Sequence, residues 1–184
     1  MKKLLLLFVF ALVTVISAQA QVGFGLRVGA NYSDFRGDDA PNTDRIFGAH
    51  AGLTANIPVS ADNFFSVQPE LLFSMKGAKN GDELRLYYID LPVLARVNTG
   101  LLYFEGGPQL SVNVGDNIDD NALFEPDFKR TGLGYVAGIG VGTPMGISVG
   151  IRYNGDFSKL YDEGNAQVYN DVLMLTLGYT FGSR

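Results

Sequence analysis

The stretch Val22-Gly23-Phe24-Gly25-Leu26-Arg27-Val28-Gly29-Ala30-Asn31-Tyr32-Ser33 alternates between two kinds of side chain. The parity that starts at Val22 is apolar and ends on Tyr32, and the other parity holds glycine or a polar residue at every position. Successive side chains of a β-strand point to opposite faces, whereas a helix repeats about every 3.6 residues. The stretch therefore predicts a strand with one apolar face and one small or polar face.

The same alternation recurs along the rest of the chain. Further stretches of this kind span residues 47–57, 65–76, 87–96, 102–113, 132–142, 147–154 and 173–181. No convincing helical pattern follows the N-terminal segment, and no linker rich in Pro, Gly or Ser divides the chain. We therefore expect one all-β domain of eight strands.

The connections between these stretches alternate in length. Residues 60–63, 98–100 and 144–146 predict tight turns, whereas residues 34–44, 77–83, 115–130 and 155–167 predict longer and more polar loops. Short turns at one end and long loops at the other are typical of outer-membrane barrels, whose strands of about ten residues cross the bilayer at a tilt of about 45°. The pattern predicts an eight-stranded antiparallel up-and-down transmembrane β-barrel.

Period two alone leaves open which parity faces outward, so a soluble lipocalin-like barrel with an apolar interior is the alternative. The apolar parity holds many Leu, Ile, Phe and Tyr side chains, more than the narrow interior of eight strands accommodates. Aromatic residues also lie toward the strand ends, where membrane girdles belong. They are Tyr32, Tyr87, Tyr153, Tyr179 and Phe181. We therefore expect the apolar parity to face lipid.

Three prolines lie inside the expected strands, at Pro69, Pro92 and Pro108. Proline has no N–H to donate to the ladder, and a closed barrel offers no free edge on which to place it. We expect β-bulges or local breaks in pairing there.

The N-terminal segment predicts a secretory signal peptide over residues 1–20, followed by a barrel domain over residues 21–184. Lys2 and Lys3 precede an apolar run from Leu4 to Ile16, and small residues at Ala18 and Ala20 suit cleavage before Gln21. The run is too short to span a bilayer, so a retained membrane anchor is the less favoured alternative.

Composition excludes several classes of protein. The 184 residues include no cysteine, so disulfides and thiolate metal sites are impossible. The formal net charge of -5 provides no basic surface for phosphates, which argues against nucleic acid as a partner. A hydrophobic fraction of 47% argues against intrinsic disorder.

Several motifs, in their order and spacing, resemble the PorT-like outer-membrane β-barrel proteins of Bacteroidetes. They are Gly25 to Ser33, Val67-Gln68-Pro69-Glu70-Leu71-Leu72-Phe73-Ser74 with Lys76-Gly77-Ala78, Tyr88-Ile89-Asp90-Leu91-Pro92, Phe104-Glu105-Gly106-Gly107-Pro108, Gly138-Ile139-Gly140, Ile151-Arg152-Tyr153 and Leu177-Gly178-Tyr179-Thr180-Phe181. The resemblance covers essentially the whole chain after the signal segment. It implies an eight-stranded barrel in a Gram-negative outer membrane.

The founding member of this family is linked to type IX secretion and gliding-associated export, but nothing in the sequence separates an export component from a generic barrel. The last strand, with Tyr179 and Phe181, looks like the carboxy-terminal signal read by the barrel-assembly machinery. Gly182, Ser183 and Arg184 follow it here, where the signal would end the chain.

The polar parity carries charges that we expect inside the barrel and in balance. They are Arg27, Arg96 and Arg152 against Glu70, Asp90 and Glu105, with His50, Gln68 and Gln109 as further lumen residues. Counting from the expected 77–83 loop sets Glu70 opposite Asp90, two carboxylates that repel unless cations join them. We expect Arg27, reaching over Gly52, and Arg152 to neutralise this pair and to block the lumen as a structural ion network.

Catalytic and metal-binding alternatives find little support. A carboxylate pair is one arrangement for glycoside hydrolysis, but no sugar would reach the middle of a blocked lumen. His50, the only histidine, has no serine beside it to form a nucleophile–base pair, and one histidine does not make a typical transition-metal site. The acidic loops, with Asp34, Asp38, Asp39, Asp44, Asp116, Asp119, Asp120, Glu125 and Asp127, lack the spacing of a calcium loop.

We therefore expect a non-enzymatic integral outer-membrane protein without a cofactor, whose loops serve adhesion, ligand contact or partner docking. Its expected partners are outer-membrane lipid, lipopolysaccharide and, during insertion, the barrel-assembly machinery. Divalent ions would bridge the acidic loops to the phosphates of lipopolysaccharide. The alternatives are a component of an export complex and a lipid-modifying enzyme. Transport is the weakest reading, because eight strands leave a lumen filled by side chains.

Overall fold

The computed structural model describes residues 22–117, 128–160 and 167–181. It contains β1 (Gly23–Arg36), β2 (Asp44–Pro58), β3 (Phe65–Asn80), β4 (Asp82–Thr99), β5 (Leu102–Asp116), β6 (Thr131–Gly142), β7 (Ile147–Asp156) and β8 (Tyr169–Thr180). No helix among the described residues is long and apolar enough to cross a membrane. The expected signal peptide over residues 1–20 lies outside the described residues.

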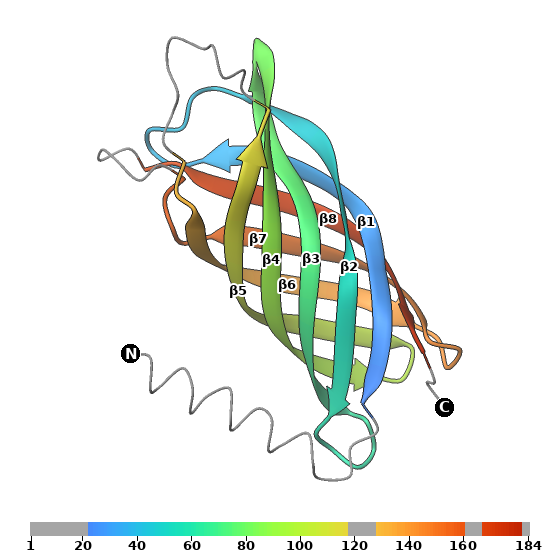
Figure 1. Ribbon diagram of the computed structural model, residues 1–184. Helices are drawn as coiled ribbons and strands as arrows, with labels where there is room; N and C mark the ends of the chain where they lie inside the picture. The colour runs from blue at the N-terminus through green and yellow to red at the C-terminus, as the bar shows by residue number, and fades with distance from the viewer. Residues whose placement is uncertain (1–21, 118–127, 161–166, 182–184) are drawn as a thin grey trace, which may run out of the picture.

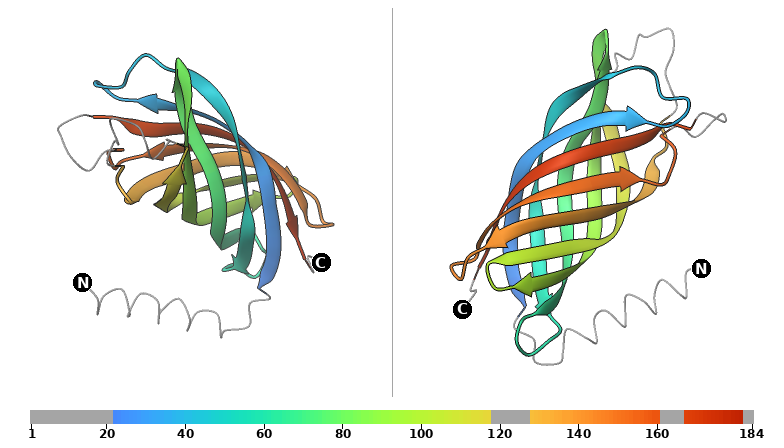
Figure 2. Two further views of the ribbon diagram at one scale, coloured as in Figure 1. Left: turned by 45° about the horizontal axis from the view of Figure 1, so that its top comes forward. Right: turned by 180° about the vertical axis from the view of Figure 1, so that it is seen from behind.

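The strands form one closed antiparallel barrel, in which each strand pairs with its sequence neighbours and β1 pairs with β8. The closing pair runs from Gly25 opposite Thr180 to Arg36 opposite Tyr169. Seen from behind in Figure 2, β1 in blue lies beside β8 in red. Closure leaves no unpaired strand edge. This suits the membrane core, where no water is present to bond to free backbone N–H and C=O groups. The predicted eight-stranded up-and-down barrel is confirmed.

The two ends of the barrel differ, as the sequence predicts. The short connections 59–64, 100–101 and 143–146 lie at the end where β1 starts and β8 stops, which we call the turn end (Figure 1). The connections 37–43 and 157–168 lie at the opposite end, which we call the loop end. In outer-membrane barrels the short turns face the periplasm and the long loops face the exterior.

The expected loop at residues 77–83 is wrong. β3 continues to Asn80, β4 starts at Asp82, and Gly81 between them has a φ of +77°. The resulting hairpin extends beyond its neighbours at the loop end (Figures 1 and 2). Charged residues at Lys79, Glu83 and Arg85 make this stretch look like a loop in the sequence, although two strands paired outside a membrane tolerate charge on both faces.

The apolar parity faces outward. Phe24 is 66% exposed and Phe47 is 72% exposed, whereas Arg27 on the opposite parity is 2% exposed. Glutamates, arginines, asparagines and serines make up most of the buried polar side chains, and leucine, isoleucine, valine and phenylalanine make up most of the exposed large ones. This inversion of the usual pattern fits a lipid-facing wall around a polar lumen.

Aromatic side chains pair on the outer surface near both ends. Tyr32 contacts Phe47 with ring centroids 4.9 Å apart, and Phe73 stacks on Tyr87 at 6.0 Å. Near the turn end, Tyr179 meets Phe181 edge to face at 5.2 Å. Such pairs belong at the two membrane interfaces, where an amphipathic ring is stable.

Each strand proline lies where the ladder with the preceding strand is interrupted. No pair is formed at Pro69 with β2, at Pro92 with β3 or at Pro108 with β4, and the register is the same on both sides of each gap. The missing N–H removes one bond without shifting the strand. The prolines therefore cause local breaks, whereas the register shifts lie elsewhere, between Arg45 and His50 and between Tyr87 and Tyr88.

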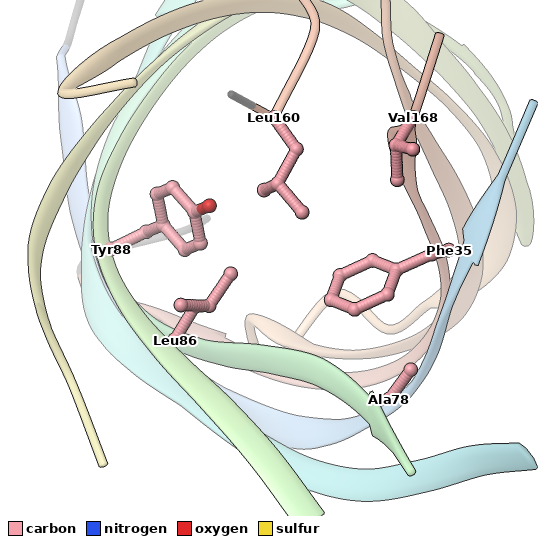
Figure 3. Packing of buried hydrophobic residues seen from close by; sticks show 6 residues of the cluster. All are labelled: Phe35, Ala78, Leu86, Tyr88, Leu160 and Val168. Carbon is pink, nitrogen blue, oxygen red and sulfur yellow. The ribbon is translucent and has the colours of Figure 1, made fainter. Parts of the chain in front are cut away.

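An apolar cluster occupies the interior at the loop end (Figure 3). Its buried members are Phe35 of β1, Ala78 of β3, Leu86 and Tyr88 of β4, and Leu160 and Val168 of the β7–β8 connection. In Figure 3 the six side chains point toward one another across the barrel interior. The backbone N–H of Leu160 also donates to the carbonyl of Val168 at 2.8 Å, which ties these two members of the cluster together.

Candidate functional site

A cluster of five charged side chains crosses the middle of the lumen, and we call it the central ion cluster: Arg27, Arg96, Arg152, Glu70 and Glu105. Arg152 binds Glu70 with both terminal nitrogens, at 2.7 Å and 2.9 Å, and its Nε lies 2.5 Å from Glu105 Oε1. Arg27 Nε lies 2.6 Å from Glu70, and Glu105 also lies 3.8 Å from Arg27 and 3.9 Å from Arg96. Two carboxylates thus share three guanidinium groups.

Neighbouring glycines give the long side chains of the central ion cluster their room. Arg27 is paired with Gly52 on β2 and with Gly178 on β8. Gly138 on β6 lies between Glu105 on β5 and Arg152 on β7. A Cβ at Gly138 would come within 2.9 Å of Arg152 Cγ and 3.4 Å of Glu105 Cγ. These glycines therefore serve as space for the ion pairs that cross the lumen.

Asp90 lies in a separate cluster, which corrects the expected Glu70/Asp90 pair. Asp90 is opposite Leu72, because the β3–β4 register is centred on Gly81. Both of its carboxylate oxygens lie 3.0 Å from Lys76 Nζ, and one accepts a hydrogen bond from Ser111 at 2.6 Å. The partner of Asp90 is therefore this lysine and not Arg27 or Arg152.

Sequence reasoning placed Lys76 on the lumen parity but left it out of the ion network. It is 1% exposed, and its ammonium lies 4.9 Å from the centre of the Tyr88 ring. The signal was available, since Lys76 is the one cation on the inward parity of β3. A buried ammonium needs a carboxylate, so this position already indicated that Lys76 pairs with one of the lumen carboxylates.

The remaining predicted polar residues join one cluster or the other. Gln68 donates to Glu70 at 2.6 Å and accepts from Arg96 at 3.2 Å, so it belongs to the central ion cluster. Gln109 donates to Ser111 at 3.0 Å, which in turn binds Asp90.

His50 stands in a third group, a hydrogen-bonded row across β1, β2 and β8. Its Nδ1 lies 2.7 Å from Asn31 Oδ1, and its Nε2 lies 3.2 Å from Thr176 Oγ1. Asn31 also donates from its amide nitrogen to Ser74 at 3.0 Å. The network assigns the ring proton to Nδ1, so that Nε2 accepts from the Thr176 hydroxyl.

This row has the order hydroxyl, imidazole and amide that a nucleophile–base–orienter arrangement uses. The hydroxyl is a threonine with 1% exposure, and Asn31 is fully buried. Gly29 lies beside the ring, and a Cβ there would come within 2.5 Å of His50 Cε1. A site packed this closely leaves no room for a substrate carbonyl.

Cations and carboxylates balance in the described lumen, but not at each level. Lys76, Asp90 and Asp156 at the loop-end level carry a net single negative charge, and the central ion cluster carries a net single positive charge. Asp156 Oδ2 accepts from Asn170 at 2.9 Å. The described residues contain no group of three or more His, Cys, Asp or Glu arranged to hold a metal ion.

Two carboxylates around the first outward loop, Asp34 near the end of β1 and Asp39 in the loop, accept hydrogen bonds from the protein itself. Asp34 accepts from the hydroxyl of Thr43 at 2.6 Å and from the amide of Phe35 at 2.8 Å. Asp39 accepts from the amide of Gln167 at 2.9 Å, which ties this loop to the β7–β8 connection. Asp119, Asp120, Glu125 and Asp127 lie outside the described residues.

Both the sequence and the fold of this chain match known outer-membrane proteins. A family model described as "Outer membrane protein beta-barrel domain" matches residues 4–181. No curated protein matches the sequence. Among solved structures, the chain is similar to Neisserial surface protein A, with a TM-score of 0.56 and 16% identity over 86% of this chain and 97% of that chain.

The chain is also similar to Ail, the attachment invasion locus protein of Yersinia pestis. The TM-score is 0.52 at 16% identity, over 86% of this chain and 98% of that chain. A second structure, of Ail in complex with the heparin analogue sucrose octasulfate, gives a TM-score of 0.52 at 18% identity. The match covers 86% of this chain and 99% of that chain. At these identities the likeness is one of fold.

Proposed function

Because the chain belongs to the outer membrane protein beta-barrel domain family, we propose that it works without catalysis, as a closed barrel that holds its loops at the cell surface for binding. It is an integral outer-membrane protein. The wall of such a protein anchors it in lipid, and the loops are the part free to meet other molecules.

The observation that carries this proposal is a lumen blocked at its middle and at its loop end. The central ion cluster crosses the middle of the barrel, and the apolar cluster around Phe35 and Leu160 occupies the loop end. An eight-stranded barrel has an interior just wide enough for its own side chains. The arrangement supports the function of a rigid scaffold and argues against that of a pore.

The His50 row supports the non-catalytic part of the proposal. A nucleophile must reach its substrate, and Thr176 lies inside the wall between Gly29 and Gly150, its strand partners. The carboxylates of the central ion cluster are likewise bound to arginines, so neither is free to act as an acid or a base.

The loops also bear on the kind of ligand. Ail has been crystallised with a polysulfated heparin analogue, but the first loop of this chain and the strand ends that flank it are acidic, with Asp34, Asp38, Asp39 and Asp44. Like charges repel a polyanion, so we infer that the surface ligand is neutral or cationic, or is anionic and bridged by divalent ions. Asp34 and Asp39 already accept hydrogen bonds from Thr43 and Gln167, which favours a neutral or cationic ligand over an anion bridged by divalent ions.

The motifs that resemble PorT-like proteins are largely accounted for by the barrel itself. Pro69 and Pro92 lie at ladder gaps, Glu70 binds Arg152 and Asp90 binds Lys76. These residues support a shared wall and lumen. An export role, the alternative that the same motifs raise, rests on no contact among the described residues.

The test compares outer-membrane vesicles carrying the wild type with vesicles carrying a variant in which residues 38–42 are replaced by Gly and Ser. Binding to arrays of glycans and purified envelope proteins is measured, and the same replacement at residues 60–63 is the matched control. We expect the loop variant alone to lose about tenfold in affinity for its ligand, or about 1.4 kcal/mol. Equal binding by both variants would contradict loop-mediated recognition.

Three further outcomes would each point to another function. Ohmic single-channel conductance in a planar bilayer would indicate a pore. A changed lipid A mass spectrum in a deletion strain would indicate an enzyme. Co-purification with export components after mild detergent extraction, unaffected by the loop replacement, would indicate the export alternative.

A further inference from the structure

The turn end of the lumen has an unbalanced cation. In the central ion cluster, Glu70 is bound by Arg152 and Arg27, and Glu105 is bound by Arg152. Arg96 reaches Glu105 only at 3.9 Å, and its hydrogen bonds within the described residues go to two neutral amides, Gln68 and Asn98. Glu105 Oε2 has no hydrogen-bond partner among the described residues and lies 3.8 Å from Arg27 and 3.9 Å from Arg96. Arg96 therefore makes the weakest contact with the two carboxylates and carries most of the surplus positive charge of the cluster.

The Arg96 guanidinium is held in a fixed plane. Its carbon lies 3.6 Å from the centre of the Tyr103 ring, so one face is stacked. Nε donates to Asn98 Oδ1 at 3.1 Å, and one terminal nitrogen donates to Gln68 Oε1 at 3.2 Å. The other terminal nitrogen makes no hydrogen bond with the described residues and points toward Gly142, where a Cβ would lie 3.6 Å away.

Arg96 and Gly142 both line a cavity of about 1300 Å³ at the turn end, which we call the periplasmic cavity. Arg96 and Tyr103 are at its inner side, and the connections 59–64, 100–101 and 143–144 form its rim. Its polar lining is otherwise largely neutral, with Asn56, Asn98 and Thr143 among the residues present. A cavity with one fixed donor cation and neutral surroundings suits a small anion.

We propose that the periplasmic cavity is a binding site for an oxyanion group, a carboxylate or a phosphate, and that Arg96 is its recognition residue. A planar guanidinium with a stacked face and two anchored nitrogens loses little freedom on binding, because its orientation is already set. The site faces the periplasm, so its ligand comes from that compartment. This role is independent of the surface loops.

Besides Glu105 of the central ion cluster, one carboxylate at the cavity rim opposes the site. Asp62, in the β2–β3 turn, is exposed at the rim and accepts from the Phe64 amide at 3.1 Å. An exposed charge at a rim is screened by water and salt, so it weakens anion entry without abolishing it. Replacing it makes a second prediction, that Asp62→Asn tightens anion binding.

The test uses the full folded barrel in lipid nanodiscs, titrated with sodium acetate or with inorganic phosphate at constant ionic strength. The side-chain N–H signals of Arg96 and the ring signals of Tyr103 are followed by NMR. We expect a saturable shift of both residues in at least one titration. Saturation by acetate alone assigns the site to carboxylates, and saturation by phosphate alone assigns it to phosphates.

Two variants make the test specific. In Arg96→Gln, binding is followed through the ring signals of Tyr103. We expect the affinity for the anion to fall about tenfold, which corresponds to the loss of one charge-assisted hydrogen bond. Gly142→Asp keeps Arg96 but places a carboxylate beside its unbonded nitrogen, and it is expected to bind the anion about tenfold more weakly than the isosteric Gly142→Asn. Arg45→Gln, on the outer wall, is expected to bind as the wild type does.

Gly142 has only ordinary van der Waals space around its Cβ position, so the Gly142 pair keeps the proposal testable if Arg96→Gln does not fold. Absence of a saturable shift with both anions would overturn the proposal. Equal affinities for Gly142→Asp and Gly142→Asn would overturn it as well. Either result leaves recognition by the surface loops unaffected.

Discussion

Arg152 and Glu105 meet across Gly138, on three adjacent strands, with the arginine Nε 2.5 Å from the glutamate Oε1. Arg152 continues to Glu70, so a single guanidinium joins two carboxylates that start from β3 and β5. The missing side chain at Gly138 makes this contact possible. The relationship shows one reason why a chain with so many large apolar residues also contains many glycines, among them Gly52, Gly138 and Gly178 beside the central ion cluster.

Gly138→Val is expected to destabilise the barrel. Its side chain would come into contact with Arg152 Cγ and Glu105 Cγ, and overpacking of this kind costs about 1–3 kcal/mol. Urea unfolding in detergent micelles, followed by tyrosine fluorescence, measures the change. Gly115→Ala is the control, since a Cβ there meets nothing within 4 Å, and an equal loss in both variants would contradict the role of Gly138.

Glu70→Gln is expected to cost about 3–5 kcal/mol of unfolding free energy. The change leaves Arg152 and Arg27 without their shared carboxylate in a lumen where their side chains are 1% and 2% exposed. The same unfolding assay measures it.

Glu83→Gln supplies the comparison for that experiment. Glu83 forms an exposed ion pair with Arg85 at 2.7 Å, and pairs of this kind contribute little to stability. We expect its unfolding midpoint to match the wild type. A loss for Glu70→Gln no larger than that for Glu83→Gln would show that the central ion cluster is not required for the fold.

Tyr103→Phe is expected to leave stability almost unchanged. The Tyr103 hydroxyl is buried and has no hydrogen-bond partner among the described residues, so its removal breaks no bond. Tyr103→Ala removes the ring that lies against Gly140 and Gly150, and we expect a loss of about 3–5 kcal/mol. Heat-dependent migration on gels and urea unfolding compare the two variants, and a large loss for Tyr103→Phe would reveal a partner for the hydroxyl.

The β2–β3 turn predicts a local pH dependence. The Ser60 hydroxyl and then the Phe64 amide, as hydrogen-bond donors to Asp62, lower the pKa of this carboxyl below its usual value of 3.8. A folded-state pKa below the unfolded one stabilises the turn above about pH 4. That stabilisation is lost as the pH falls through the lowered pKa.

NMR titration of the Asp62 side chain measures this shift directly. Ser60→Ala removes the larger of the two causes, so we expect the pKa of Asp62 to rise toward its usual value. An unchanged pKa in Ser60→Ala would show that the backbone amide alone is responsible.

The face on which most side chains of the barrel wall lie was predictable, because the alternation of a strand is a local property. Arg27, Glu70, Asp90, Glu105 and Arg152 all lie on the parity opposite the large apolar residues, and parity follows from the pleat of each strand. Pairing was less predictable. An error of one residue in the centre of the β3–β4 turn moved Glu70 from the gap opposite Pro92 to a false partner, Asp90.

The sequence by itself determined that the chain is an eight-stranded membrane barrel, which face of each strand meets lipid, and that six charges enter the lumen, those of Arg27, Glu70, Asp90, Arg96, Glu105 and Arg152. Asp156, expected in a loop, is a further lumen charge that the structure places at the end of β7. Only the tertiary structure decided which of those charges meet, that Lys76 serves Asp90, and that Arg96 is left with most of the surplus charge beside the periplasmic cavity. The physical reason is that alternation is a property of one strand. Contacts across the lumen join strands far apart in the chain, and these depend on register, turn geometry and barrel closure together.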